Sequence, residues 1–206
     1  IRDSGYDPNT IVDDHKFEGG PSNATNTYAG KIPLRYAVAK SLNTVAWQVY
    51  EQVTPKVGLQ YLKNMNFSSI VKDDYTLATS LGGFTKGVSP LEMASAYAAL
   101  ENDGMFRQPN CIKSIVDADE NVVYSSQMAE VSIYEKDATR TMTDVLTTVM
   151  DSGTGAALKL SNMPCAGKTG TTNDHKDGWF VGYTRYYTTS VWVGCDYPKS
   201  ISNLSG

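Results

Sequence analysis

The spacing of apolar residues predicts a mainly helical first half of the chain. From residue 34 to residue 53, apolar side chains recur every three or four positions, which is the spacing of one buried helix face. Ser41 and Asn43 interrupt this stripe, and both side chains compete with helical backbone hydrogen bonds. We therefore predict two helices with a tight break at 41–43, the second capped by Asn43. Residues 1–31 are rich in turn formers and are predicted to be mostly loop.

Three further helices are predicted along the chain. A short one covers residues 55–65 and a longer amphipathic one covers 136–151. Between them, Ser89 is suited to cap a helix whose first residue is Pro90, with Glu92 as the acid of a capping box.

The remaining segments predict antiparallel strands. A hairpin is expected between residues 111 and 124, around an acidic, turn-forming loop. In the last third, residues 166–172 can be extended, and the β-branched and aromatic runs 179–184 and 189–195 are typical of strands. Asp177-Gly178 is a hairpin turn signal. The predicted fold class is α+β, with an antiparallel sheet flanked by helices.

Composition excludes several classes of protein. Of the 206 residues, 41% are hydrophobic and 19% are charged, and the formal net charge is −4. These values are typical of a folded chain with one core, and not of a disordered one. The negative charge argues against nucleic-acid binding. No run of about 18 apolar residues, as a membrane-spanning helix needs, is present.

The cysteines and histidines give no sign of a structural metal. Three cysteines are an odd number without C-x-x-C spacing, so they cannot form a closed set of disulfides. The two histidines, His15 and His175, lie far apart in the sequence and neither is beside a cysteine. We therefore predict neither a zinc site nor a cofactor.

The segment around Lys168 is the first candidate for chemistry. Its Gly-Lys-Thr sequence resembles the end of a phosphate-binding loop, but Asn162 stands where that loop needs glycine, and strands are predicted to follow instead of a helix. On a strand, Thr169 and Thr171 point to one face, and Gly170 lets a ligand approach the backbone. This suits a carboxylate-bearing peptide laid antiparallel on the strand edge. The alternative is an ordinary exposed strand with a solvated lysine.

Ser41-Leu42-Asn43 is the second candidate. A hydroxyl can relay a proton and an amide can hold a peptide group, and both can face one cleft from a helix–helix break. The alternative is a turn with an asparagine cap.

Together these two segments resemble a known combination. S-x-x-K, S-x-N and K-T-G occur together in β-lactamases and penicillin-binding proteins, and Ser41-Leu42-Asn43 and Lys168-Thr169-Gly170 match the last two. The chain resembles class A penicillin-binding proteins over nearly its whole length. Further similar stretches are 30–37, 81–83, 87–94, 153–155 and 177–184.

The resemblance implies a D,D-transpeptidase domain with the β-lactamase-like fold. In this family an active-site serine attacks the D-Ala-D-Ala bond of peptidoglycan stem peptides, and β-lactams acylate the same serine. Ser41 would pass a proton to the leaving amine, and Asn43 would bind the substrate's peptide group and the lysine partner of the nucleophile. Lys168 would stabilise charge, while Thr169, Gly170 and Thr171 would bind the substrate, with the Thr171 N–H as an oxyanion donor.

One motif of the family is missing. No S-x-x-K precedes Ser41, and Ser69-Ile70-Val71-Lys72, the one match, follows it in a polar stretch. We expect residues 1–206 to be the C-terminal part of one transpeptidase domain, incomplete at its N-terminal side. The nucleophile, a glycosyltransferase domain and a membrane anchor would precede Ile1, and the protein would act at the extracytoplasmic face of a bacterial membrane. A serine β-lactamase and a non-catalytic module that binds β-lactams or peptidoglycan are the alternatives.

Overall fold

A three-stranded antiparallel sheet lies at the centre of the computed structural model, which describes residues 5–206. Its strands are β7 (Ala166–Thr171), β8 (Gly178–Tyr183) and β9 (Thr188–Val193), in that spatial order. The predicted meander is confirmed. The predicted turn at Asp177-Gly178 is wrong, because Gly178 already pairs with Thr171 inside the sheet and the connection spans 172–177.

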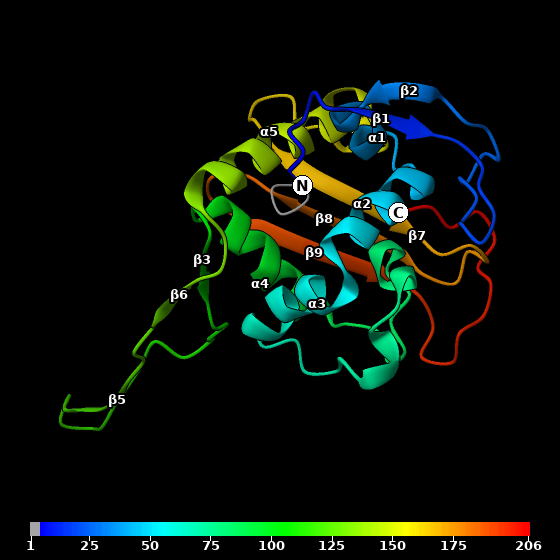
Figure 1. The fold of residues 1–206 in the computed structure, drawn as a ribbon. Helices are drawn as coiled ribbons and strands as arrows, with labels where there is room; N and C mark the ends of the chain where they lie inside the picture. Colours follow the sequence, from blue (N-terminus) through cyan, green and yellow to red (C-terminus); the bar gives the residue numbers. More distant parts are fainter. Residues whose placement is uncertain (1–4) are drawn as a thin grey trace.

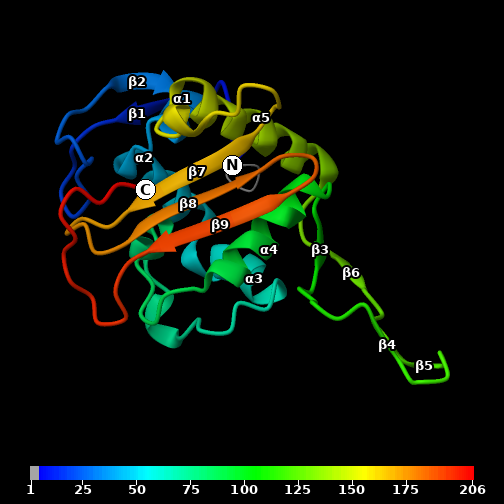
Figure 2. The ribbon, with the colours of Figure 1, turned by 180° about the vertical axis from the view of Figure 1, so that it is seen from behind.

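Helices cover one face of this sheet (Figure 1). In the described chain, α4 (Pro90–Glu101) and α5 (Lys136–Ser152) pack directly on the strands, and α1 (Leu34–Ala39) packs on α5. The other two helices, α2 (Asn43–Val53) and α3 (Pro55–Asn64), pack on each other. Seen from behind, the other face of the sheet carries no helix of the described chain (Figure 2). No helix within residues 5–206 has both the length and the apolar character to cross a bilayer.

The core forms where α4 and α5 pack on the sheet. Val149 of α5 is fully buried, and Ala166 of β7 and Tyr183 of β8 are 3% and 4% exposed. Tyr97 of α4 packs against Tyr183, with ring centroids 6.2 Å apart. The apolar stripe of α5 therefore fixes the position of β7.

The helix boundaries follow local sequence chemistry. At the start of α4, the Glu92 N–H donates to Ser89 Oγ over 3.2 Å, and Glu92 Oε2 accepts from the Ser89 N–H over 2.8 Å, which confirms the capping box. The break between α1 and α2 is also confirmed, but Asn43 does not cap α2. Leu42 takes the cap position and Asn43 is the first helical residue, with its amide turned to the Ser22 carbonyl at 2.9 Å.

The N-terminal region contains two strands instead of loop alone. β1 (Ile11–Asp14) pairs antiparallel with β2 (Gly30–Pro33), so the loop prediction is wrong for 11–14 and 30–31. Val12 and Ile32 pair across these strands and pack against the cluster of Leu34 and Val45. The rest of the predicted loop stands from residue 5 on, and residues 1–4 lie outside the described chain.

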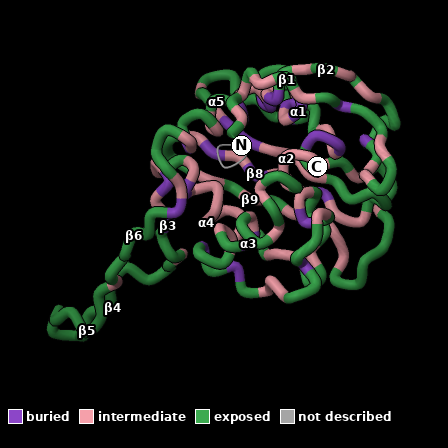
Figure 3. Tube along the Cα trace, viewed as in Figure 1, coloured by how far each residue is buried: buried purple, intermediate pink, exposed green. Residues whose placement is uncertain are grey.

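An arm projects from the body opposite the N-terminal sheet (Figure 1). At its base β3 (Met105–Arg107) pairs with β6 (Glu130–Ser132), and at its tip β4 (Ser114–Val116) pairs with β5 (Val122–Ser125), both antiparallel. The predicted hairpin is therefore confirmed. Every residue of β4 and β5 is exposed, as Figure 3 shows. Residues 5–206 also contain short 3₁₀ turns at Lys72–Asp74, Leu77–Leu81 and Ala156–Leu158.

A buried carboxylate fixes the start of α2. Asp14 is 1% exposed and accepts hydrogen bonds from Asn23 Nδ2 at 2.7 Å, from the Ala29 N–H at 2.7 Å and from the Thr44 hydroxyl. Burial alone raises the pKa of Asp14, but these hydrogen bonds outweigh it and hold the pKa below its usual value. Because Thr44 follows Asn43, this network holds the beginning of α2 against β1.

We expect Asp14→Asn to destabilise the fold by about 2 kcal/mol, since it removes charge-assisted hydrogen bonds and brings an amide against donors. Because the folded-state pKa of Asp14 is lowered, its contribution is present above the unfolded pKa of about 3.9 and is lost as the pH falls through the folded-state value. The variant should therefore lose less stability than the wild type between about pH 5 and pH 2. Urea unfolding across this range measures the effect.

Asp13→Asn is the matched control, because the side chain of Asp13 is about half exposed and faces away from this network. It should behave like the wild type. Equal acid sensitivity of Asp14→Asn and the wild type would contradict the role of the Asp14 carboxylate.

Candidate active site

A hydrogen bond between Lys168 and Ser41 brings the two candidate segments together. Lys168 Nζ in β7 donates to Ser41 Oγ at 2.8 Å, although 127 residues separate them. Of the three residues that the family resemblance assigns to one site, Ser41, Asn43 and Lys168, the first and last are therefore in direct contact. Asn43 lies two residues beyond Ser41 at the first position of α2, and its amide nitrogen contacts Ser22.

The backbone at the α1–α2 break presents the Ser41 hydroxyl. Ser41 has a φ of 56°, in the left-handed region that few residues other than glycine and asparagine adopt. This conformation reverses the chain after α1, and the Leu42 N–H still donates to the Ala37 carbonyl at 3.0 Å. Next to it, Lys40 Nζ donates to the Ser152 carbonyl at 2.8 Å, at the end of α5. The break is therefore held against α5 as well as β7.

Lys168 is only partly accessible to water. Desolvation by burial lowers its pKa from the usual 10.5 to about 8. Besides Ser41, its Nζ donates to the Thr169 carbonyl at 2.9 Å. An amine with this pKa can exchange protons near neutral pH, whereas an ordinary lysine stays charged. The Lys168–Ser41 pair can therefore move a proton as well as attract an anion.

β7 lies at an edge of the sheet and offers donors there. The Thr172 N–H donates to the Asp177 carbonyl at 3.0 Å, on the β8 side. Because the direction alternates along an antiparallel strand, the N–H of Gly170 also faces β8, and those of Thr169 and Thr171 face the free edge. This is the arrangement that a peptide added alongside β7 would use.

The side chains of β7 fit the same interpretation. The Thr169 hydroxyl lies 2.7 Å from that of Thr154, and the Thr171 hydroxyl accepts from the Gly206 N–H at 3.0 Å. At Gly170 an added Cβ would lie 3.4 Å from the Trp179 Cβ, which is ordinary van der Waals contact. Packing within the chain therefore does not require glycine at this position.

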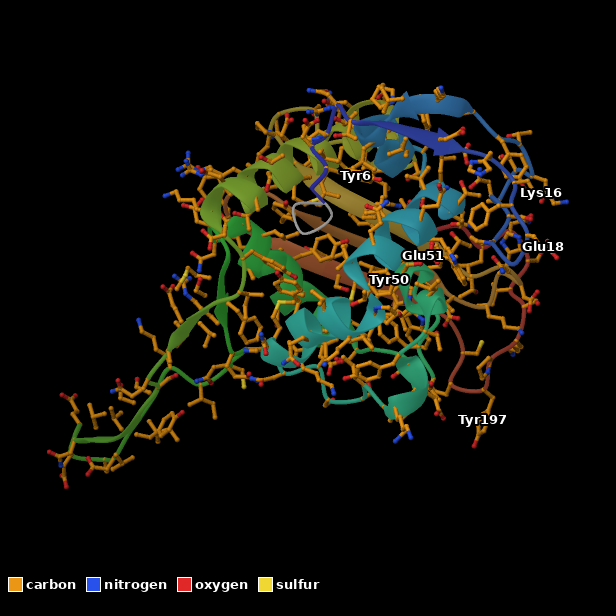
Figure 4. The ribbon with its side chains drawn as sticks, viewed as in Figure 1. Tyr6, Lys16, Glu18, Tyr50, Glu51 and Tyr197 are labelled. Carbon is orange, nitrogen blue, oxygen red and sulfur yellow. The ribbon has the colours of Figure 1, made fainter. Side chains whose placement is uncertain are left out.

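Helix α2, which carries Asn43, contacts neighbouring segments at its C-terminal end, where Figure 4 labels Tyr50 and Glu51. Tyr50 accepts a hydrogen bond from the Thr79 hydroxyl at 3.1 Å, and its ring fills the space beside Gly58 of α3, where a Cβ would lie 2.3 Å from it. Gln52 Nε2 donates to Tyr6 Oη at 2.7 Å. These contacts hold the C-terminal end of α2, and the hydrogen bond between Thr44 and Asp14 holds its start.

The structure argues against two alternatives from the sequence, a phosphate-binding loop at Lys168 and a nucleophile at Ser69. Lys168 lies within a strand, so the phosphate-binding loop does not form. Ser69 Oγ donates to the Gly87 carbonyl at 2.6 Å, and Lys72 begins a 3₁₀ turn, so this S-x-x-K is not on an α-helix. Within residues 5–206, no group of three His, Cys, Asp or Glu side chains is arranged to hold a metal.

Sequence reasoning did not single out Thr154, whose hydroxyl contacts that of Thr169 in the structure. Its signal was present only as Gly153-Thr154-Gly155, one of the stretches that carried the family resemblance. A cavity of about 470 Å³ lies elsewhere, at the base of the arm, and none of its lining residues belongs to the candidate site.

Comparison with known proteins finds penicillin-binding proteins, the family that the sequence resembles, over nearly the whole chain. Residues 3–197 match the model of the penicillin binding protein transpeptidase domain. The chain is 33% identical to penicillin-binding protein 4 of Bacillus subtilis, over 99% of the chain and 33% of that protein. It is 36% identical to penicillin-binding protein 1A of Aquifex aeolicus, over 90% of the chain and 25% of that protein. The chain thus spans a third or less of the length of these relatives.

The fold is also similar to solved structures. The structure of PonA1 from Mycobacterium tuberculosis in complex with penicillin V has a TM-score of 0.82 and 23% identity, over 98% of this chain and 59% of that one. Penicillin-binding protein 1A from Haemophilus influenzae has a TM-score of 0.78 and 21% identity, over 97% of this chain and 36% of that one. At these identities the likeness concerns the fold.

Lys168 should titrate with a midpoint near pH 8, because its ammonium is desolvated. Nuclear magnetic resonance of lysine side chains labelled with ¹⁵N measures this midpoint. The signal should disappear in Lys168→Arg, which assigns it. If every lysine signal titrates above about pH 9.5, the burial inferred for Lys168 is wrong.

Proposed function

The chain belongs to the transpeptidase family of penicillin-binding proteins, and from this membership we propose that its protein cross-links peptidoglycan by acyl transfer. The donor is the D-Ala-D-Ala end of one stem peptide and the acceptor is an amine of a neighbouring stem peptide. The hydrogen bond between Lys168 and Ser41 carries the proposal, because it joins the S-x-N and K-T-G segments in one site. β-Lactams are proposed to acylate the same serine as the substrate.

Ser41 and Lys168 do not supply the nucleophilic serine that the mechanism needs. A serine hydroxyl is a weak nucleophile until a base takes its proton. Ser69 and Lys72 do not form such a pair, since the Ser69 hydroxyl is bound to the Gly87 carbonyl. We propose that an S-x-x-K segment elsewhere in the longer protein provides the nucleophile, and that residues 1–206 are the C-terminal part of its transpeptidase domain.

Acylation proceeds through a proton transfer at Ser41. The nucleophilic serine of the S-x-x-K segment passes its proton to its lysine partner, and its oxygen attacks the carbonyl carbon of the penultimate D-Ala. The negative charge that develops on the carbonyl oxygen is bound by the outward N–H of Thr171. As the C–N bond breaks, the Ser41 hydroxyl gives its proton to the departing D-Ala nitrogen and takes one from Lys168 Nζ. The acceptor amine then attacks the acyl-enzyme and gives one proton back to Lys168 through Ser41. The nucleophilic serine leaves and recovers its own proton from its lysine partner. A pKa of about 8 suits Lys168 to this transfer.

Substrate recognition uses the free edge of β7. The stem peptide lies antiparallel to the strand, where Gly170 leaves its backbone accessible. The hydroxyls of Thr169 and Thr171 and the charge of Lys168 hold the terminal carboxylate. Asn43, at the start of α2, binds the peptide group of the substrate and the lysine that activates the nucleophile.

Two other functions remain distinguishable from this one. A β-lactamase needs a general base that activates water for deacylation, and the described contacts of Ser41, Lys168, Thr169 and Thr171 include no carboxylate. Sustained turnover of nitrocefin would identify a β-lactamase. A non-catalytic module would bind β-lactams or peptidoglycan without any acyl transfer.

The proposed place of action follows from the substrate. Peptidoglycan is assembled outside the bacterial cytoplasm, so we place the protein at the extracytoplasmic face of the cell membrane, held by an anchor elsewhere in the longer protein. Its partners are peptidoglycan stem peptides, β-lactam antibiotics and the rest of its own chain.

Lys168→Ala in the longer protein should slow acylation by benzylpenicillin by about 10²- to 10³-fold, the usual cost of removing one group that stabilises transition-state charge. Labelling with fluorescent penicillin over time measures the rate. The matched control is Lys159→Ala, since Lys159 pairs with Asp151 at the surface, 2.7 Å away. Equal rates for Lys168→Ala and the wild type would leave Lys168 a structural lysine.

The 206-residue chain alone should not be labelled by penicillin, because within residues 5–206 no serine has a lysine one α-helical turn away at an S-x-x-K site. Intact-mass spectrometry after penicillin treatment measures this. A stoichiometric adduct mapped to Ser41 or Ser69 would show that the nucleophile lies within this chain.

A further inference from the structure

A pair of threonine hydroxyls links β7 to the turn after α5. Thr154 Oγ1 and Thr169 Oγ1 are 2.7 Å apart, and each hydroxyl has one hydrogen, so one of the two donates to the other. Thr169 belongs to the proposed carboxylate-binding strand, whereas Thr154 follows the last turn of α5 and lies outside that strand.

The backbone holds Thr154 in place through the end of α1. The Thr154 N–H donates to the Ala39 carbonyl at 3.0 Å, two residues before Ser41. At the preceding position, a Cβ on Gly153 would lie 2.4 Å from the Ala39 oxygen and 2.8 Å from the Val149 oxygen, so only glycine allows this approach. Thr154 is thus fixed to the same helix end that presents Ser41.

We propose that Thr154 is a positioning residue that sets the direction of the Thr169 hydroxyl. This inference rests on the proposed function, in which a carboxylate of the ligand lies against Thr169. A carboxylate only accepts hydrogen bonds, so Thr169 must donate to it. The Thr169 oxygen is then free to accept, and the Thr154 hydroxyl donates to it, which strengthens the bond from Thr169 to the anion.

The arrangement makes the site favour a ligand whose hydrogen-bonding oxygen is negatively charged. Without Thr154, the Thr169 hydroxyl loses the neighbour that favours its donor orientation, and its hydrogen is free to rotate away from the ligand. The loss should be larger for a carboxylate than for its uncharged ester, because hydrogen bonds to ionised acceptors are about twice as strong as those to neutral ones. A residue that served only to fold the turn would affect both ligands equally.

The test compares Thr154→Val and Thr154→Ser in the longer protein, with benzylpenicillin and its methyl ester as probes. Thr154→Val keeps the shape and removes the hydroxyl, and it should lower the second-order acylation rate for the acid by about 5- to 10-fold. The rate for the ester should change by less than about twofold. Thr154→Ser should restore the rate for the acid. Thr141→Val is the control, because Thr141 is an exposed threonine of α5 whose hydroxyl bonds only to its own helix.

A double variant separates positioning from folding. In a Thr169→Val background, Thr154→Val should have little further effect, because its action passes through the Thr169 hydroxyl. Equal losses for acid and ester, additive losses in the double variant, or unchanged rates in Thr154→Val would each overturn the proposal. If the wild type is acylated by neither probe, the proposed function itself fails, and the positioning role fails with it.

Discussion

The hydrogen bond between Lys168 and Ser41 is the constraint on which the site depends, because it joins an edge strand to a helix break far away in the sequence. Each partner is positioned by other contacts. Ser41 is presented by a left-handed turn that Lys40 ties to the end of α5, and Lys168 is held by a strand packed on the same helix. Helix α5 therefore supports both sides of the site. Burial in this packing also desolvates the ammonium of Lys168 and lowers its pKa to about 8.

Buried carboxylates organise the loops around this framework. Asp14 and Asp74 are almost fully buried, and each accepts several hydrogen bonds from nearby N–H and hydroxyl groups. Asp74 accepts from the N–H groups of Val71 and Thr85 and so closes the segment before α4 in the way that Asp14 closes the segment before α2. Burial alone would raise the pKa of both carboxyl groups, but their hydrogen bonds outweigh this effect and hold each pKa below its usual value. Long irregular connections can thus hold fixed shapes with little apolar core of their own.

Much of this architecture could be predicted from the sequence where the signal is local. The helix break at Ser41, the capping box at Ser89 and the meander from β7 to β9 depend on neighbouring residues, and all three were predicted. The missed features depend on distant partners. β1 is only four residues long, and its Asp13-Asp14 sequence by itself is typical of a turn. In the folded chain the Asp14 carboxylate is held by Asn23, Ala29 and Thr44, which are distant in the sequence. Asn43 and Thr154 are also placed by contacts across the fold, which periodicity does not encode.

The exposed arm has a consequence for how the molecule moves. A two-stranded ribbon with both faces in water gains little from burial and has little stability of its own. Its tip can therefore open while α5 and the central sheet stay closed, so the free energy of this opening is far below that of global unfolding. Amide hydrogens in β4 and β5 are therefore expected to exchange through such local openings, and those of β8 only through larger ones. Changes of length at the tip also leave the distant strand β7 undisturbed, which frees this loop to diverge faster than the site.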